Sequence, residues 1–320
     1  MRLRELGPQE YARDVLPLTF PLWAGRRTFD QYVAQTGEIA RGAYGRRHYR
    51  TIGLYDSGAL VSSFKRYERT IRSGSKPLRA IGFGAVFTPE PYRGRGYASV
   101  MLAAELDRAR ADGCHLAYLF SDIRPQFYTP LGFVELPSRR MILRADALPS
   151  QRIAPKPLRD DDWNAVRRCF EACESERAAA FTRGAPVWGW IALRVRQASE
   201  HVTGREFNLV LRRPRGGIRA YVLGARAPER DAYLLDEFGF ADQASARLIP
   251  ALLRAAAGDL RRVRGWMPPT HARATLPRVT SSKRTSAILM MAPLTPEGRL
   301  AVAGILAAKG GDFSWGTDHI

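Results

Sequence analysis

The segment TPEPYRGRGYAS, residues 88–99, decides how the first half of this 320-residue chain is expected to fold. It joins an extended run, residues 78–88, to residues 97–112, where apolar side chains recur close to the spacing of one helix face. A helix that begins here leaves its first backbone N–H groups without partners inside the helix, at the positive end of the helix dipole. The segment therefore predicts an anion-binding site at a helix N-terminus.

The residue types of this loop suit a diphosphate. Gly94 and Gly96 lack the Cβ atoms that would block its approach. Arg93 and Arg95 add charge-assisted hydrogen-bond donors. The loop lacks the third glycine of a dinucleotide fingerprint and the Gly-Lys-Ser/Thr ending of a P-loop, so these two phosphate sites are excluded. An arginine-rich loop that only caps the helix remains the alternative.

Extended and helical segments alternate along the first half. Extended runs are predicted at 2–6, 47–56, 59–72, 78–88, 115–121 and 138–144, and helical stretches at 8–22, 28–40, 97–112 and, as a short turn, 125–130. The glycine of Asp56-Ser57-Gly58 predicts a hairpin turn, because glycine accepts a positive φ. Residues 115–121 are apolar almost throughout, which is typical of a strand buried on both faces. This order predicts an α/β (α+β) fold with a sheet flanked by helices.

A second motif, Phe127-Tyr-Thr-Pro-Leu-Gly-Phe133, follows the buried strand. The loop also matches the pattern Arg/Gln-x-x-Gly-x-Gly/Ala at Arg93, Gly96 and Ala98. Together these motifs resemble the GNAT superfamily of acyl-CoA N-acyltransferases over about residues 1–145. The resemblance implies a mixed, mostly antiparallel sheet flanked by helices and acetyl-CoA as cosubstrate, with no metal. It also implies direct attack of a primary amine on the thioester, without a covalent enzyme intermediate.

The resemblance assigns a role to each part of the loop and its surroundings. Residues at the end of the preceding strand are expected to pair through their backbones with the pantetheine arm: Val86, Phe87 and Thr88. Residues of the loop and the first helical turn are expected to hold the diphosphate: Arg93, Gly94, Arg95, Gly96, Tyr97, Ala98 and Ser99. Ser121 and Asp122, at the end of the next strand, are expected to line the gap where the thioester lies.

Tyr128 is the residue that the resemblance implies as general acid. Aminolysis of a thioester expels a thiolate, which a phenol at hydrogen-bond distance can protonate as it leaves. A packed aromatic ring whose hydroxyl caps a carbonyl is the alternative. Of the nearby carboxylates, Glu90 is expected to be solvated and Asp56 to be structural, so these residues do not identify the general base.

The second half repeats the order of the first. Strands are predicted near 206–212, 218–226, 231–237 and 261–267, a helix at 242–257, and a last extended run at 287–294 that echoes residues 140–143. Prolines at 149, 155 and 157 favour a linker near residue 150. Because no arginine-glycine turn precedes the second helix, the division predicted is a catalytic GNAT domain at 1–148, a degenerate GNAT-like domain at 149–295 that has lost CoA, and a tail at 296–320.

An active copy followed by a degenerate one resembles the Eis-like acetyltransferases. In that group the terminal carboxylate of the chain serves as general base, which implies Ile320 for this role. About 25 residues follow the second repeat here, too few for the third domain of that group. The ending FSWGTDHI, residues 313–320, is rich in aromatic and polar side chains for a plain tail. A tail that is frayed or merely docked is the alternative.

The net charge of +19 raises the question of polyanion partners. Arginines are spread along the whole chain without a basic tail, so nucleic acid is not expected as the main partner. A small-molecule amine is the expected acceptor, with a protein lysine as the other acceptor and homo-oligomerisation left open. The rival hypothesis is a non-catalytic protein that senses acyl-CoA or binds nucleic acid.

The three cysteines are too few for a disulfide framework. Cys169 and Cys173 have a spacing that suits half a metal site, but no nearby histidine or second pair completes it, so both are expected to be small buried residues. Cys114 is also expected to be structural. Neither a signal peptide nor an apolar run long enough to span a bilayer is recognised, which predicts a cytoplasmic protein without a membrane partner.

Overall fold

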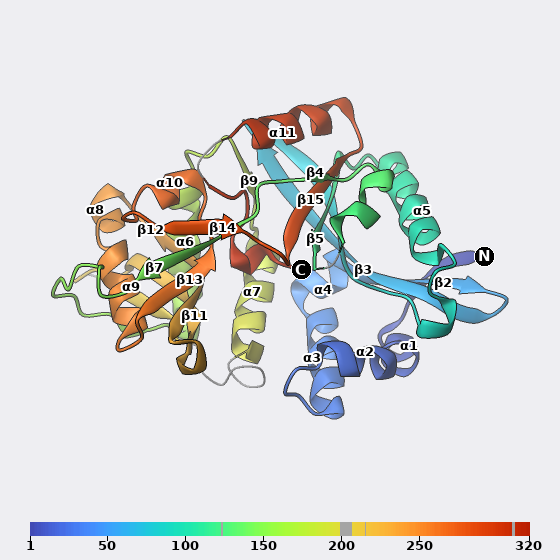
Figure 1. Ribbon diagram of the computed structural model, residues 1–320, viewed down its shortest axis with the longest axis horizontal. Coiled ribbons are helices and arrows are strands. Elements are labelled where there is room, and N and C mark those ends of the chain that lie inside the picture. Colours follow the sequence, from blue (N-terminus) through green and yellow to red (C-terminus); the bar gives the residue numbers. More distant parts are fainter. Residues whose placement is uncertain (123, 199–206, 215, 309–310) are drawn as a thin grey trace.

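The computed structural model describes residues 1–122, 124–198, 207–214, 216–308 and 311–320. Within these ranges the chain forms two β-sheets with helices packed against them (Figure 1). Parallel pairing joins β4 (Lys76–Phe87) to β5 (Leu116–Ser121) and β12 (Ala232–Phe240) to β13 (Arg262–Trp266), while the other described pairs are antiparallel. The predicted mixed, mostly antiparallel sheet flanked by helices is confirmed. No helix among the described residues is long and apolar enough to cross a membrane.

The first sheet is built mainly from the first half of the chain. Its other strands are β1 (Arg2–Leu6), β2 (Tyr49–Asp56), β3 (Ala59–Ser73), β6 (Val134–Glu135), β9 (Ala179–Phe181) and β15 (Ile288–Pro293). Their order is β1-β2-β3-β4-β5-β15-β6, with β9 beside β3. The associated helices are α1 (Pro8–Asp14), α2 (Leu16–Trp23), α3 (Phe29–Arg41), α4 (Ala43–His48), α5 (Tyr97–Ala111) and α11 (Pro296–Ala307).

The second sheet has the order β14-β7-β13-β12-β11-β10-β8. Its remaining strands are β7 (Arg139–Arg144), β8 (Lys156–Pro157), β10 (Leu209–Arg212), β11 (Ile218–Ala227) and β14 (Thr280–Lys283). The helices of this half are α6 (Trp163–Glu174), α7 (Ala185–Gln197), α8 (Gln243–Ala246), α9 (Ile249–Ala257) and α10 (Thr270–Arg273). Short 3-10 turns occur at 90–92, 125–127, 129–131, 160–162, 228–230 and 316–318.

Prolines divide two of the predicted helices. The stretch 8–22 forms α1 and α2, with Pro17 in the first turn of α2. The stretch 242–257 forms α8 and α9, with Pro250 in the first turn of α9. In a continuous helix each proline ring would clash with the carbonyl four residues earlier. Residue 206, where a strand was predicted to begin, lies outside the described residues.

Two strands cross the predicted boundary at residue 148. β7, expected to complete the first domain, pairs with β13 and β14 in the second sheet. β15, from the second half, lies between β5 and β6 in the first sheet. Residues 288–292 are all buried and suit an interior position covered on both faces, whereas β7 carries exposed arginines and suits a half-exposed one. The boundary therefore does not separate the two sheets.

The core of the first sheet lies on both faces of β5, all of whose residues are buried. On one face Ala117 and Leu119 pack with Met101 and Leu102 of α5. On the other face Tyr118 belongs to a cluster that includes side chains of α11 and of the C-terminal segment, among them Ile305 and Phe313. Full burial of one such side chain contributes roughly 1.5–3 kcal/mol. The described parts of the segment 296–320 that was expected as a tail, residues 296–308 and 311–320, therefore contribute to the folded core.

Candidate active site

The N-terminus of α5 is open in the way that the sequence predicts. Gly96 is its N-cap residue, with φ 77° and no side-chain capping bond. The first bond inside the helix runs from the Val100 N–H to the Gly96 carbonyl at 3.0 Å, so the N–H groups of residues 97–99 have no acceptor within the helix. A Cβ added at Gly94 or Gly96 would meet nothing within 4 Å, but both residues have a positive φ. It is therefore the positive φ of the backbone, and not a lack of room for a Cβ, that requires glycine at these two positions.

A hollow of about 260 Å³ lies against this helix end. It is lined by six of the seven residues predicted to hold the diphosphate, Arg93, Gly94, Gly96, Tyr97, Ala98 and Ser99, and by Thr88, Tyr92 and Phe127. The Arg93 Nε donates to the Thr88 carbonyl at 3.1 Å and closes the loop. Arg95 does not line the hollow; its guanidinium carbon lies 6.0 Å from the centre of the Tyr92 ring. Asp56 accepts a 2.8 Å hydrogen bond from the Tyr97 hydroxyl, a structural role.

The parallel strands β4 and β5 separate next to this hollow. Their pairing runs from Ala80 with Leu116 to Phe83 with Leu119. Beyond it Ala85 has φ 47°, and the register of β4 with β3 skips Ala85 and Val86. The β4–β5 pairing ends at Phe83, so the edge of β4 that faces β5 has no strand partner among the described residues from Gly84 onward, which includes the predicted pantetheine residues Val86 and Phe87. The Phe87 carbonyl instead accepts from the Ser62 hydroxyl at 3.0 Å, and Thr88 contacts the same hydroxyl.

Tyr128 combines a buried ring with an available hydroxyl. The ring packs against Phe127 and Phe133, with centroid distances of 4.9 and 6.0 Å. It belongs to the same apolar cluster as Val86 and Tyr97, which places it beside the strand and helix ends described above. No described residue forms a hydrogen bond with its hydroxyl. Burial, assisted by the charge of Asp122, raises the pKa of Tyr128 to about 12, so the phenol stays protonated at neutral pH.

Ser121 and Asp122 end β5 at the far side of the gap. Ser121 is buried and pairs with Ile288 of β15. One carboxylate oxygen of Asp122 accepts from the Ala287 N–H at 2.9 Å and fixes the start of β15. Asp122 also lines a cavity of about 570 Å³ that includes Trp266 and His319. The structure thus gives Asp122 a structural bond in addition to its place at the gap.

The C-terminal segment lies between the two sheets, where Figure 1 shows the C-terminus at the centre of the molecule. A Cβ added at Gly84, where β4 leaves β5, would lie 3.4 Å from the Ile320 carbonyl carbon. A Cβ added at Gly82 would lie 2.6 Å from the Ile320 side chain. The two glycines therefore make room for Ile320 against β4. The terminal group lies at the start of the β4–β5 gap.

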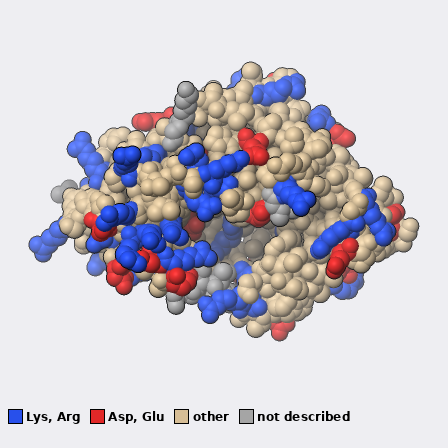
Figure 2. Space-filling view, in the orientation of Figure 1, with Lys and Arg blue, Asp and Glu red and all other residues tan. Residues whose placement is uncertain are grey.

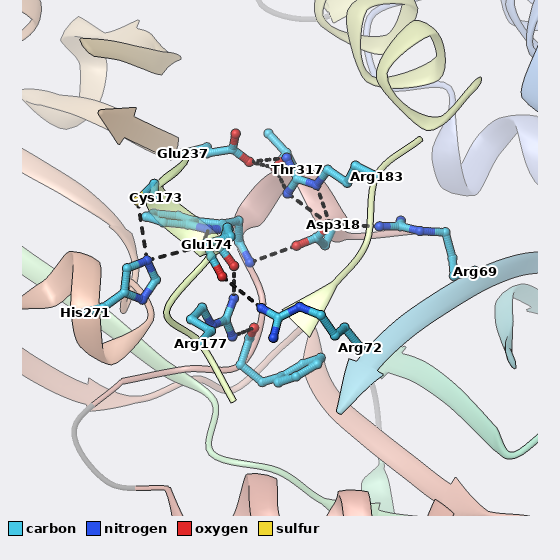
Figure 3. A network of polar contacts seen from close by, with 12 residues as sticks. Arg69, Arg72, Cys173, Glu174, Arg177, Arg183, Glu237, His271, Thr317 and Asp318 are labelled. Carbon is cyan, nitrogen blue, oxygen red and sulfur yellow. Dashed lines mark hydrogen bonds and ion pairs between the residues drawn. The ribbon is translucent and has the colours of Figure 1, made fainter. Parts of the chain in front are cut away.

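A buried polar network holds this segment in place (Figure 3). Asp318 accepts hydrogen bonds from Arg69 of β3 at 3.0 Å and from Arg183 at 3.1 Å. Arg183 also donates to Glu237 of β12 at 2.7 Å. Burial alone would raise the pKa of Asp318, but the two guanidinium groups outweigh it and hold that pKa below its usual value. Asp318 is therefore a fixed anion between the two sheets.

His319 was not singled out by the sequence, yet it lines the 570 Å³ cavity. Its ring packs between Phe120 and Trp266, with centroid distances of 5.2 and 5.7 Å. Its carbonyl accepts from Arg194 at 2.6 Å. Burial, together with the charge of Arg194, lowers the pKa of His319 to about 4. The sequence pointed to this region only through the aromatic and polar composition of residues 313–320, and that composition does not reveal where the segment docks.

In the second half a carboxylate occupies the corresponding helix start. Asp242 caps α8 by accepting from the Ser245 N–H at 2.7 Å, and its other oxygen pairs with Arg213 at 2.9 Å. A carboxylate at this position repels a diphosphate and takes up the N–H donor that would bind one. The start of α8 is therefore capped by a side chain, whereas the start of α5 is not.

Comparison with known proteins gives a family match for the first half. Residues 25–135 match the acetyltransferase (GNAT) domain family. A lysine acetyltransferase of Yarrowia lipolytica (strain CLIB 122 / E 150) is 32% identical over 110 residues, which are 32% of this chain and 28% of that protein. The match thus spans less than a third of either chain.

Solved structures resemble both halves. A probable N-acyltransferase of Enterococcus faecalis V583 has a TM-score of 0.73 and 13% identity, covering 93% of this chain and 73% of that one. Eis1 from Mycobacterium abscessus has a TM-score of 0.60 and 13% identity, covering 92% and 73%. At these identities the likeness shows the fold, and it extends across both sheets.

Proposed function

We propose that this chain, which carries the predicted GNAT acetyltransferase domain at residues 25–135, is an acyltransferase that moves an acetyl group from acetyl-CoA to a primary amine of a small molecule. The observation that carries the proposal is the open N-terminus of α5 beside the gap between β4 and β5. An anion site next to a split between parallel strands suits a ligand with a diphosphate at one end and an extended arm at the other.

The residues of the hollow fit the phosphate end of acetyl-CoA. The N–H groups of residues 97–99 point at the diphosphate, and Arg93 adds positive charge. Beyond Phe83, where pairing with β5 ends, the free edge of β4 offers the pantetheine arm a strand to pair with. Ser121 and Asp122 line the opposite side of the gap. Bound in this way, acetyl-CoA supplies an activated thioester at the end of β5.

Tyr128 acts on the leaving sulfur. As a protonated phenol without a hydrogen-bond partner among the described residues, it donates to the thiolate that aminolysis expels. Its raised pKa excludes it as the group that deprotonates the amine at neutral pH. The acid and the base are therefore different groups.

The amine approaches through the cavity between the sheets. The carboxylates of Asp122 and Asp236 line this cavity beside the guanidinium groups of Arg27 and Arg194, so an ammonium group finds local anionic contacts there and no net negative field. Ile320 lies against Gly84 at the start of the gap and follows His319, which lines the cavity; its terminal carboxylate is the proposed base. A carboxylate on a docked segment removes the proton of the amine without reorganising the sheet.

The basic surface is a weaker guide to function. Figure 2 shows Lys and Arg side chains gathered on the side of the molecule where β7, β13 and β14 lie. Exposed basic residues on and beside these strands include Arg139, Arg140, Arg144, Arg261 and Lys283. Three of them are paired with carboxylates, at Asp146, Asp231 and Glu135. This pairing reduces the positive field and disfavours a nucleic-acid-binding protein without catalytic activity.

The test is acetyl-CoA binding by isothermal titration, followed by a thiol-release screen over aminoglycosides, polyamines, amino acids and peptide lysines. Gly96→Glu should abolish binding, since it forces a side chain into a positive φ and places a carboxylate at the diphosphate site. Gly74→Glu is the matched control, because Gly74 also has a positive φ and open space but lies in the β3–β4 turn. Binding by Gly96→Glu that equals the wild type would overturn the assignment of the site. Thiol release with peptide lysines alone would identify a protein lysine, and not a small-molecule amine, as the acceptor.

A further inference from the structure

A thiol, a carboxylate and an imidazole meet beneath the docked C-terminal segment. Cys173 and Glu174 end α6, and His271 lies in the short helix α10, 98 residues along the chain from Cys173. Figure 3 shows the three side chains pointing toward one another. Cys173 and Glu174 are buried and His271 is half-buried, and one ligand atom from each lies within 4.8 Å of the other two. The sequence did not predict this cluster, because the histidine is distant from the cysteine along the chain.

The distances fit a tetrahedral metal site. The Cys173 Sγ lies 3.4 Å from the His271 Nε2, which in turn lies 3.4 Å from the Glu174 Oε1. Ligands at the usual Zn–N, Zn–O and Zn–S lengths are separated by about 3.3–3.6 Å at tetrahedral angles. Two of the three pairs thus already have the spacing that a bound ion imposes.

The surrounding groups orient the carboxylate for this role. Glu174 Oε2 is held by Arg177, while Oε1 faces His271 and accepts from the Trp315 Nε1 at 3.0 Å. An oxygen with two lone pairs can accept from Trp315 and still bind an ion. Hydrogen bonds to the ligands of a metal fix their direction. Oε1 is therefore the oxygen available to a cation.

Cys173 differs from its neighbour in the same helix. Cys169, one turn earlier, is buried and donates to the Ile218 carbonyl, an ordinary structural contact. Cys173 instead faces the imidazole nitrogen. A simple ion pair between Glu174 and a protonated His271 is the competing arrangement, but such a pair makes no use of the thiol.

We propose that Cys173, Glu174 and His271 bind one zinc ion. The ligand set of thiolate, imidazole and carboxylate suits zinc among the common divalent ions. Three protein ligands leave a fourth position, which water can reach from the cavity of about 430 Å³ that His271 and Arg177 line. The ion joins α6 to α10 and, through Glu174 and Trp315, supports the segment that carries His319 and Ile320.

The test uses the untagged full-length protein, freed of metal by a chelator and titrated with Co²⁺ as a spectroscopic probe. We expect one equivalent to bind, with a thiolate-to-cobalt charge-transfer band and the visible bands of a tetrahedral site. One equivalent of Zn²⁺ should displace it and raise the melting temperature. Failure of the wild type to bind stoichiometric cobalt or zinc overturns the proposal.

Variants identify the ligands. Cys173→Ser should abolish the charge-transfer band and weaken zinc binding by about 100-fold or more, whereas Cys169→Ser, the matched control, should change neither. If Cys173→Ser does not fold, His271→Gln decides, because its half-buried side chain tolerates replacement and its loss should also weaken zinc binding. A band that survives in Cys173→Ser, or zinc binding unchanged in His271→Gln, contradicts the assignment.

Discussion

At the scale of single residues, burial decides which groups can act in the proposed reaction. Desolvation disfavours the charged form of a phenol, so Tyr128 with a pKa of about 12 is a hydrogen-bond donor and not a base at neutral pH. The same effect keeps His319 neutral, since burial lowers its pKa to about 4. Among the described residues the gap has two carboxylates: that of Asp122, which accepts from the Ala287 N–H, and the terminal carboxylate of Ile320, which is the proposed base.

Tyr128→Phe should lower turnover by roughly 10²-fold, because the variant keeps the packed ring and loses only the donor to the thiolate. Affinity for acetyl-CoA should stay nearly unchanged, since the diphosphate residues are untouched. Steady-state kinetics and titration calorimetry measure the two effects. Tyr92→Phe is the control, as it removes a phenol that lines the diphosphate hollow instead. Equal turnover in Tyr128→Phe and wild type would remove Tyr128 from the mechanism.

At the scale of elements, a clamp of three arginines binds the C-terminal segment at the two residues before Ile320. Arg69 and Arg183 hold Asp318, two residues before the end, while Arg194 holds the His319 carbonyl. Removing one partner of a buried ion pair costs about 3–5 kcal/mol. The clamp therefore fixes the position of Ile320 without involving Ile320 itself.

Deletion of Ile320 should lower turnover by about 10²-fold or more, since the terminal carboxylate is then one residue short of the gap. The fold should persist because the Asp318 clamp remains, with a melting temperature lowered by the lost packing of Ile320 against Gly82 and Gly84. Ile320→Leu is the control: it keeps the carboxylate and a side chain of the same volume, so its activity should stay close to wild type. Intact-mass analysis checks which residue ends each protein. Full activity after deletion would exclude the terminal group as base.

The elements themselves were largely predictable, because local patterns encode them. The period of residues 97–112 and the apolar run at 115–121 led to α5 and β5, and positive φ at Gly94 and Gly96 explains the loop between β4 and α5. α4 was missed, and its last two residues, 47 and 48, were assigned to the extended run 47–56. A Cβ at Gly45 of α4 would lie 2.0 Å from the Ile39 carbonyl oxygen, so close packing with α3 explains this glycine.

At the scale of the whole molecule, long-range pairing decides what local patterns cannot. The segments containing β7 and β15 resemble each other in sequence, and only their burial in the two sheets separates their places. The clamp likewise joins residues from four distant segments, such as Arg69 and Asp318. No spacing along the chain encodes such contacts. A cut at residue 148 would remove β15 from the first sheet and β7 from the second, so the two sheets form one folding unit.

His319 should destabilise this unit as the pH drops from about 6.5 to 4. Asp312 acts in the opposite direction, because burial raises its pKa to about 7 and the folded state then binds its proton first. The unfolded chain protonates His319 near the ordinary histidine pKa of about 6.5, whereas the folded chain does so near 4. The unfolded state therefore binds more protons at His319 across this window, which costs the fold on the order of 3 kcal/mol by pH 4. Arg194 and Arg284, which face the ring, strengthen the shift, and Asp122 opposes it.

Urea unfolding of the wild type and of His319→Gln at pH 7, 5.5 and 4 isolates this contribution, because Asp312 acts in both proteins. The difference in free energy of unfolding between the two should change by on the order of 3 kcal/mol over this range. The more exposed His48→Gln is the control and should keep the pH dependence of the wild type. A difference that stays constant from pH 7 to 4 would mean that His319 is not buried as a neutral ring between the sheets.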